Sequence, residues 1–291
     1  MPALRFLVRY AYAPLFLVGF IAAALAIVAG GGGKLVLLPL LLVAVGVAFL
    51  AERILPYELA WNEARGDAGR DWLHAVVNEA SIFAGIAAIP LLAAVVPGLG
   101  IWPTGWPLWA QLVVAILVVD LGITLAHWAS HKLGWLWRFH AVHHSVGRMY
   151  GFNGLMKHPI HQAIELSAGT APLLLAGMTV EAGALLAFAV AIQLLLQHSN
   201  ADYRVGPFVY LWAVAPGHRH HHLASKTDGD VNFGLFTMLW DHALGTFEVA
   251  RPQPLDGEID VAGRPDYPVR YGAQLIEPFR RQDRHLVEPS G

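Results

Sequence analysis

Nine histidines of this 291-residue chain repeat one short spacing. They form one HxxxH motif, two HxxHH motifs and one isolated position: His127, His131, His140, His143, His144, His198, His218, His221 and His222. Imidazole is a good ligand for zinc, copper, iron and nickel. On a helix, positions i, i+3 and i+4 share a face, so each motif can direct its imidazoles toward one point. Nine candidates are too many for one ion, so the pattern predicts a centre of two metal ions.

The other histidines are expected to stay away from the metals. His74, His242 and His285 have the structural roles that histidine commonly takes. His220 lies inside the last motif, but on a helix it points about 100° away from its neighbours. We therefore do not expect His220 to be a ligand.

Polar side chains near the motifs are candidates to orient the ligands, because a metal-bound histidine usually donates its other N–H to a carboxylate or carbonyl. These candidates are Asp120, His158, His161, Asp230, Asn232 and Asp241. Asp120 lies two helical turns before His127 in an apolar segment, where an acid indicates a function. A hydrogen bond between helices explains Asp120 equally well. If residues 161–165 are helical, Glu165 shares a face with His161 and could orient its imidazole.

The composition is that of a membrane protein, with 56% hydrophobic and only 14% charged residues. A soluble domain is about 25% charged. The chain has no cysteine, which excludes disulfides, thiolate catalysis and cysteine-ligated clusters within it. The net charge is −2 and no basic face stands out, so nucleic acid is not expected as a partner.

Four apolar segments approach or reach the roughly 20 residues that a spanning helix needs: residues 11–29, 35–55, 74–96 and 107–126. The third is expected to stop at Pro97. Two shorter segments, 162–178 and 182–197, either span as a tight pair or enter and leave from one side, and Pro172 is expected to interrupt the first. The predicted fold is all-α: a multi-pass transmembrane helical bundle of four long spans and a shorter helical hairpin, with a histidine-rich di-metal cap.

Positive charge predicts the orientation of this bundle. With Arg5 and Arg9 in the cytoplasm, six crossings leave Lys34 as the only one of the 19 lysines and arginines outside. Cytoplasmic loops carry an excess of Lys and Arg. Both termini and every histidine motif are therefore expected on the cytoplasmic side.

The ligand set favours redox chemistry over hydrolysis. A zinc hydrolase usually uses three protein ligands and a water, and its HExxH helix carries a glutamate base. The corresponding segment here is HWASH, from His127 to His131. Eight or nine imidazoles fit two ions with four or five ligands each and open positions for oxygen. Iron would be the useful occupant, although zinc binds such sites more tightly and could occupy them in purified protein.

The motifs and their flanking residues resemble the fatty acid hydroxylase / sterol desaturase superfamily of integral-membrane di-iron oxygenases. The matching segments, in order, are HWASH, RFHAVHHS (138–145), His158-Pro159, Gln197-His198, PGHRHHH (216–222) and DVNFGLFTMLWDHALGTF (230–247). The resemblance covers residues 105–250. It implies that the nine motif histidines hold two iron ions, with no catalytic residues beyond these ligands.

The resemblance also implies the reaction. Members use O2 as co-substrate and two external electrons to hydroxylate or desaturate unactivated C–H bonds of sterols, fatty acyl chains or related lipids, in lipid biosynthesis. On this view residues 1–104 are N-terminal transmembrane helices, 105–250 the catalytic region and 251–291 a cytoplasmic tail. The chain has no dinucleotide fingerprint and no cysteine, so an external donor (a reductase, ferredoxin or cytochrome-type protein) is expected to dock on the cytoplasmic face.

Two other functions remain open from the residues alone. A membrane metal transporter or sensor would place ligands along the membrane interior, whereas here they gather at one face. A membrane zinc hydrolase would need a base that HWASH lacks.

Overall fold

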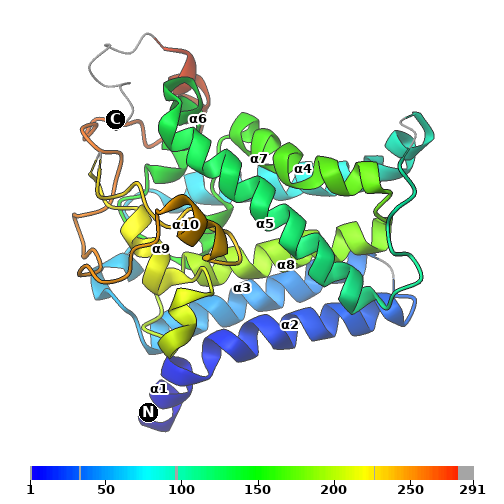
Figure 1. The fold of residues 1–291 in the computed structure, drawn as a ribbon. Helices are drawn as coiled ribbons and strands as arrows, with labels where there is room; N and C mark the ends of the chain where they lie inside the picture. The colour runs from blue at the N-terminus through cyan, green and yellow to red at the C-terminus, as the bar shows by residue number, and fades with distance from the viewer. Residues whose placement is uncertain (1, 33, 96–97, 226, 281–291) are drawn as a thin grey trace.

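The computed structural model describes residues 2–32, 34–95, 98–225 and 227–280, and over these ranges every regular element is a helix (Figure 1). The α-helices are α1 (Pro2–Tyr10), α2 (Tyr12–Ala29), α3 (Leu37–Ile54), α4 (Ala68–Val95), α5 (Leu108–Lys132), α6 (Gly134–His144), α7 (Pro159–Ala176), α8 (Val180–Gln197), α9 (Ala215–His221), α10 (Leu239–Leu244) and α11 (Tyr271–Ile276). Short 3-10 helices connect them: η1 (Lys34–Val36), η2 (Leu59–Asn62), η3 (Gly151–Leu155), η4 (Gly206–Tyr210) and η5 (Glu277–Phe279). The all-α prediction is confirmed. Pro97 and His285, for which the sequence made predictions, lie outside the described residues.

Five helices are long and apolar enough to cross a membrane: α2, α3, α4, α5 and α8. They include the four predicted long spans. The α5 helix runs six residues past its predicted end at Ala126, and these residues carry His127 and His131. The α7 helix is not among the five, because its first turns carry His161, Gln162 and Glu165.

The predicted interruption at Pro172 is wrong, since α7 continues through it to Ala176. A proline removes one helical N–H and frees the carbonyl four residues earlier, here that of Ala168. This carbonyl lies against Gly122 of α5, where a Cβ atom would be 2.3 Å from its oxygen. The absence of a side chain at Gly122 therefore lets α5 pack close to α7 at the point where the proline weakens it.

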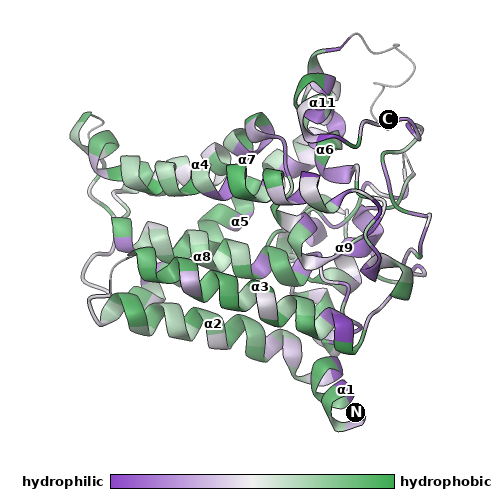
Figure 2. Ribbon diagram, turned by 180° about the vertical axis from the view of Figure 1, so that it is seen from behind, coloured by the Kyte–Doolittle hydropathy of each residue, from purple (hydrophilic) through white to green (hydrophobic). Residues whose placement is uncertain are grey.

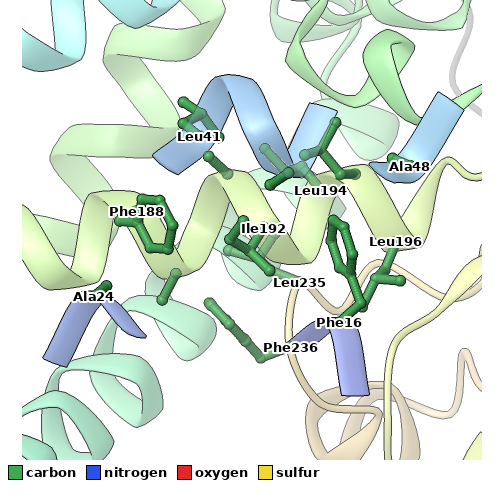
Figure 3. Packing of buried hydrophobic residues seen from close by; sticks show 14 of the residues in the cluster. Phe16, Ala24, Leu41, Ala48, Phe188, Ile192, Leu194, Leu196, Leu235 and Phe236 are labelled. Carbon is green, nitrogen blue, oxygen red and sulfur yellow. The ribbon is translucent and has the colours of Figure 1, made fainter. Parts of the chain in front are cut away.

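The α8 helix forms the centre of the bundle. Of its spanning segment 78% is buried, compared with 22% for α2. Figure 3 shows Phe188 and Ile192 of α8 packed among side chains of α2 and α3, and Phe236 from the segment before α10 reaching the same core. Apolar residues cover the long helices, and the polar residues concentrate at the end that carries α9 (Figure 2). Burial of α8 thus fixes where its last residue, and His198 after it, must lie.

The polar end of the bundle is built from α6, α9, α10 and the loops around them (Figure 1). The segment predicted to be a tail packs against it as far as Arg280. Gln274 of α11 is fully buried, accepts from His74 Nε2 over 2.9 Å and donates to Ser145 Oγ over 2.8 Å. His74 also bonds the Lys157 carbonyl, over 3.0 Å, so it ties α4 to this region.

Gly122→Ala should destabilise the protein. Alanine is a better helix former than glycine by about 1 kcal/mol, but the new Cβ would push α7 away through the Ala168 carbonyl. We expect a net loss of about 1–3 kcal/mol, measured as a lower melting temperature in detergent. Gly46→Ala on α3 is the matched control, because nothing lies within 4 Å of the added atom. Equal melting temperatures for the two variants would show that the α5–α7 contact has no role.

Candidate metal centre

The nine motif histidines lie together at the polar end of the bundle, and all are buried. Their ring nitrogens form two groups. The five-histidine group is His127, His131, His140, His144 and His221. The four-histidine group is His143, His198, His218 and His222. Two groups of this size match the expectation of four or five imidazoles per ion.

The two HxxHH motifs each contribute to both groups, contrary to the expectation that each motif aims at one point. His140 and His144 of α6 enter the five-histidine group, while His143 enters the other. In the second HxxHH motif, at the end of α9, His218 and His222 stay together and His221 enters the five-histidine group. Adjacent positions such as 143 and 144 point about 100° apart on a helix. Each motif can therefore contribute ligands to two neighbouring ions.

The imidazoles of each group meet through their Nε2 atoms. In the five-histidine group, Nε2 of His127 lies 2.8 Å from Nε2 of His221, and Nε2 of His144 lies 3.0 Å from that of His140. In the four-histidine group, Nε2 of His198 is 3.2 Å from Nε2 of both His143 and His218. Nitrogens that share one ion at about 2.1 Å lie roughly 3 Å from each other. The spacing therefore fits a metal ion in each group.

Three of the motif histidines bond main-chain carbonyls through Nδ1 over 2.9 Å, whereas the Nδ1 atoms of His140, His218 and His222 are buried without a hydrogen-bond partner among the described residues. Nδ1 of His127 lies 2.9 Å from the Phe233 carbonyl, that of His143 2.9 Å from the Met156 carbonyl, and that of His221 2.9 Å from the Val231 carbonyl. A carbonyl can only accept, so Nδ1 carries the proton and the Nε2 lone pair faces the group. Facing lone pairs repel each other, and a cation between them removes this repulsion. The donor chemistry thus fits a metal.

Burial also keeps these imidazoles uncharged. It lowers the pKa of His143, His144 and His221 well below the usual value for histidine, and nearby histidines lower all three further. For His198 the pKa falls to about 3. Metal binding requires neutral imidazole, so the site needs no deprotonation at neutral pH.

Four acids and amides were predicted to orient the metal ligands: Asp120, Asp230, Asn232 and Asp241. Of these, Asp230 bonds a motif histidine directly. Its Oδ1 lies 2.9 Å from His131 Nδ1, and its other oxygen accepts from Lys132. Asp241 acts one step away, accepting from the backbone N–H of Phe233 over 2.7 Å and so holding the carbonyl that bonds His127.

Asp120 and Asn232 hold loops, and among the described residues their hydrogen bonds do not reach a motif histidine. Asp120 accepts from the Phe236 N–H over 2.6 Å and from the Thr237 hydroxyl over 2.6 Å. It therefore joins α5 to the segment before α10, and its hydrogen bonds within the described ranges go to that segment rather than to another spanning helix or an imidazole. Asn232 has a left-handed backbone (φ 57°) and donates to the Gly217 carbonyl over 2.8 Å.

The remaining histidines take separate positions. His158 begins α7, where its Nδ1 accepts from the Ile160 N–H over 3.1 Å. His220 bonds the Arg251 carbonyl over 2.9 Å, and His242 bonds the Tyr210 carbonyl over 2.9 Å. None of these three belongs to a metal-binding group found in the described part of the chain.

His161 forms a third possible metal-binding group with His140 and Glu165, and its ring centre lies 4.5 Å from that of His140. Its Nε2 bonds Ser130 Oγ over 2.9 Å. Glu165 shares its face of α7, but the carboxylate is 3.8 Å from His161 Nδ1, too far for a hydrogen bond. Glu165 instead pairs with Lys157.

The Lys157–Glu165 pair is a feature that the sequence analysis missed. Both residues line a small pocket at the histidines, together with Ile123, His143 and other side chains. Glu165 is almost fully buried and the Lys157 side chain is 12% exposed. Glu165 lies within an apolar segment, where an acid is costly to bury without a partner. Its position could therefore have predicted a buried ion pair.

Comparison with known proteins gives a consistent set of relatives. The family model described as fatty acid hydroxylase matches residues 112–246. Ornithine lipid hydroxylase OlsE of Rhizobium tropici is 32% identical over 254 residues, which cover 84% of this chain and 75% of the relative. Alkylglycerol monooxygenase of Danio rerio is 31% identical over 152 residues, 50% of this chain and 31% of the relative.

The human alkylglycerol monooxygenase is 23% identical over 185 residues, 64% of this chain. The chain spans between 31% and 38% of the length of these two monooxygenases, so their likeness concerns a part of each. No solved structure matches the chain significantly.

Gly154→Ala should impair the four-histidine group. A Cβ at Gly154 would lie 2.7 Å from His198 Nδ1 and 2.7 Å from the Leu194 carbonyl, so the His198 ring must move. We expect the purified variant to retain about half the metal of the wild type, since only one group is disturbed. Elemental analysis measures this directly. Gly147→Ala is the control, with nothing within 4 Å of its added atom; a metal content as low as that of Gly154→Ala would contradict the interpretation.

Proposed function

The chain belongs to the fatty acid hydroxylase family, and from that membership we propose that it is a membrane-embedded di-iron oxygenase. It uses O2 and two external electrons to hydroxylate an unactivated C–H bond of a membrane lipid. The relatives are named hydroxylase and monooxygenase, which favours hydroxylation over desaturation. The observation that carries the proposal is the pair of buried imidazole groups with converging Nε2 atoms.

One iron ion would be held by each group. His127, His131, His140, His144 and His221 would bind the first, and His143, His198, His218 and His222 the second. When bound, an iron pair supplies the O2 activation and C–H cleavage that protein side chains cannot provide. The chain's own contribution is to fix the imidazoles through main-chain carbonyls and to place one carboxylate, Asp230, behind His131. Zinc would fit the same nitrogen donors in purified protein.

The lipid chain would reach the metals through an apolar cavity of about 170 Å³ between α4, α5, α7 and α8. Its lining residues are apolar apart from Thr170. Ile123 lines both this cavity and the pocket at the histidines, and His127 follows it by one turn of α5. Ile123 thus lies between the apolar cavity and the metal centre, which supports this cavity as the path of the hydrocarbon chain.

The metal end of this path differs from the rest. Lys157 and Glu165 are the ionisable residues, other than histidines, that line the pocket at the centre. The charged pair Lys157–Glu165 favours contact with a polar group of the lipid. The apolar cavity between α4, α5, α7 and α8 favours the hydrocarbon chain. We infer that the lipid binds with its chain in the cavity and its polar part toward Lys157 and Glu165. The carbon that is oxidised would then lie near the polar part.

We further propose, from the sequence, that the metal centre faces the cytoplasm and that a separate protein supplies the electrons. The excess of lysine and arginine at the histidine end supports cytoplasmic termini and a cytoplasmic metal centre. The electron donor, a reductase, ferredoxin or cytochrome-type protein, would dock there, since the chain has no cysteine for an iron–sulfur cluster. Residues 105–250 would form the catalytic region, supported by the helices of residues 1–104, with 251–291 on the cytoplasmic side.

Removal of one ligand from either group should abolish turnover. His221→Ala disturbs the five-histidine group and His143→Ala the four-histidine group. Mutation of a residue that only hydrogen-bonds a metal ligand typically lowers metal affinity or activity by roughly 10–100-fold. We therefore expect loss of a ligand itself to lower activity at least about a hundredfold in each variant. Product is measured by lipid mass spectrometry and by O2 consumption with iron-loaded protein. His242→Ala, at an exposed histidine away from both groups, should remain active. Full activity in both ligand variants would contradict the assignment of these histidines as metal ligands. Formation of product without O2 uptake would indicate a hydrolase instead of an oxygenase.

Filling the apolar cavity should shorten the lipid chains that the protein accepts. Ala187 lines the cavity, so Ala187→Phe places a ring in the path without contacting a histidine. We expect normal metal content and a rate with long-chain lipid reduced by about tenfold or more, with shorter chains affected less. Val113→Phe adds an aromatic ring on the exposed side of α5 and serves as control. Equal chain-length profiles for the two variants would exclude this cavity as the substrate path.

A further inference from the structure

A second polar pocket, of about 520 Å³, lies at the histidine end of the bundle but outside the metal centre. Its walls come from Tyr57, the segment 202–210 with η4, α9 and the segment around Gln253. His218 lines the pocket at the metals, whereas its neighbours in α9, Pro216 and Arg219, line this one. The α9 helix therefore separates the two pockets.

Arg219 is the most unusual group in the wall. It is 1% exposed, and its guanidinium carbon lies 3.8 Å above the centre of the Tyr57 ring. Its hydrogen bonds go to the carbonyls of Ser199 (2.8 Å) and Ala201 (3.1 Å) and to the Gln253 side chain (2.8 Å). All of these acceptors are uncharged. In the described part of the chain, Arg219 forms no ion pair with a carboxylate.

A second arginine adds to the charge. Arg204 also lines the pocket, is exposed, and forms no ion pair among the described residues. The one carboxylate in the wall, Asp202, is bound to Arg9 over 2.5 Å and is thereby neutralised. The pocket thus has two unpaired positive charges and no unpaired negative one among its lining residues. Such a pocket favours an anion with several oxygen acceptors.

The surface beside the pocket is apolar and suited to a membrane boundary. Phe208, Tyr210 and Leu211, in and after η4, are 65%, 54% and 55% exposed. The helix α1 lies next to this segment, because the Arg204 N–H donates to the Arg9 carbonyl over 2.7 Å. It exposes Phe6 and Leu7 and precedes the spanning helix α2. Aromatic and basic residues together are typical of the interface between headgroups and hydrocarbon.

We propose that this pocket binds the phosphate of an anionic phospholipid from the leaflet at the histidine end. Arg204 takes the phosphate oxygens, Arg219 adds positive charge in the wall behind them, and the exposed side chains of η4 and α1 lie against the acyl region. The bound lipid is distinct from the one oxidised, because α9 lies between it and the metal centre. The proposal therefore does not depend on the chemistry at the histidines.

The test is native mass spectrometry of the purified protein in detergent. Dioleoyl phosphatidylglycerol and dioleoyl phosphatidylcholine are titrated separately, and inorganic phosphate is added as competitor. We expect a single phosphatidylglycerol to bind roughly five- to tenfold more tightly than phosphatidylcholine. Arg204→Gln should abolish this preference, and Arg204→Lys should keep most of it. Arg53→Gln is the matched control, at an exposed arginine that ends α3 and does not line the pocket.

The outcomes separate the sources of the anion. Equal binding of the two phospholipids by the wild type, or an unchanged preference in Arg204→Gln, would overturn the proposal. If inorganic phosphate alone displaces phosphatidylglycerol with similar affinity, the pocket binds free oxyanions and the lipid assignment fails. Arg219→Lys provides a second variant that keeps the charge, and it should keep the preference for phosphatidylglycerol. Because ligand variants such as His143→Ala leave the pocket intact, their lipid preference should equal that of the wild type.

Discussion

The structure depends on one electrostatic constraint, which is that nine buried imidazoles bring their Nε2 atoms close together. The closest Nε2 atoms are 2.8–3.3 Å apart, a spacing that is unfavourable without a cation between them. What fixes the rings is mainly the backbone. Carbonyls of Phe233, Val231 and Met156 accept the Nδ1 protons and so determine which nitrogen faces inward. A polar cap that places these carbonyls correctly is therefore as necessary as the histidines.

Buried carboxylates hold the loops of this cap in place. Glu52 at the end of α3 accepts from the N–H of Gly151 over 2.7 Å and of Asn200 over 3.0 Å. It thereby joins η3 to the turn that follows His198. Asp120 and Asp241 bind backbone N–H groups of residues 233–237 in the same way. Each acid satisfies main-chain donors that water would otherwise have to reach, and each connects a loop to a helix or a turn.

The contrast between the apolar spans and the polar cap also organises the binding surfaces. The cavity between α4, α5, α7 and α8 is lined almost entirely by apolar residues, and it shares Ile123 with the separate pocket that contains the charged pair Lys157–Glu165. The close approach of Gly122 to the Ala168 carbonyl brings α5 and α7 together along one side of this cavity. On the other side of α9, Arg219 lines the second pocket and forms no ion pair with a carboxylate of the described residues. The single turn of helix that carries His218 and Arg219 thus faces both the metal centre and the second pocket.

Much of this protein follows from local sequence. Runs of about 20 apolar residues predicted the long helices, and the HxxxH and HxxHH spacings selected the nine histidines that lie together. Both are properties of single segments, because a helix turns every 3.6 residues and a membrane has a fixed thickness. Tertiary structure decided how the histidines divide into five and four, since positions 143 and 144 point about 100° apart and meet different neighbours. It also decided that α7 passes through Pro172, that Asp120 binds a loop, and that Glu165 pairs with Lys157. These outcomes depend on which distant segment packs against a given face, and no periodicity within one segment contains that information.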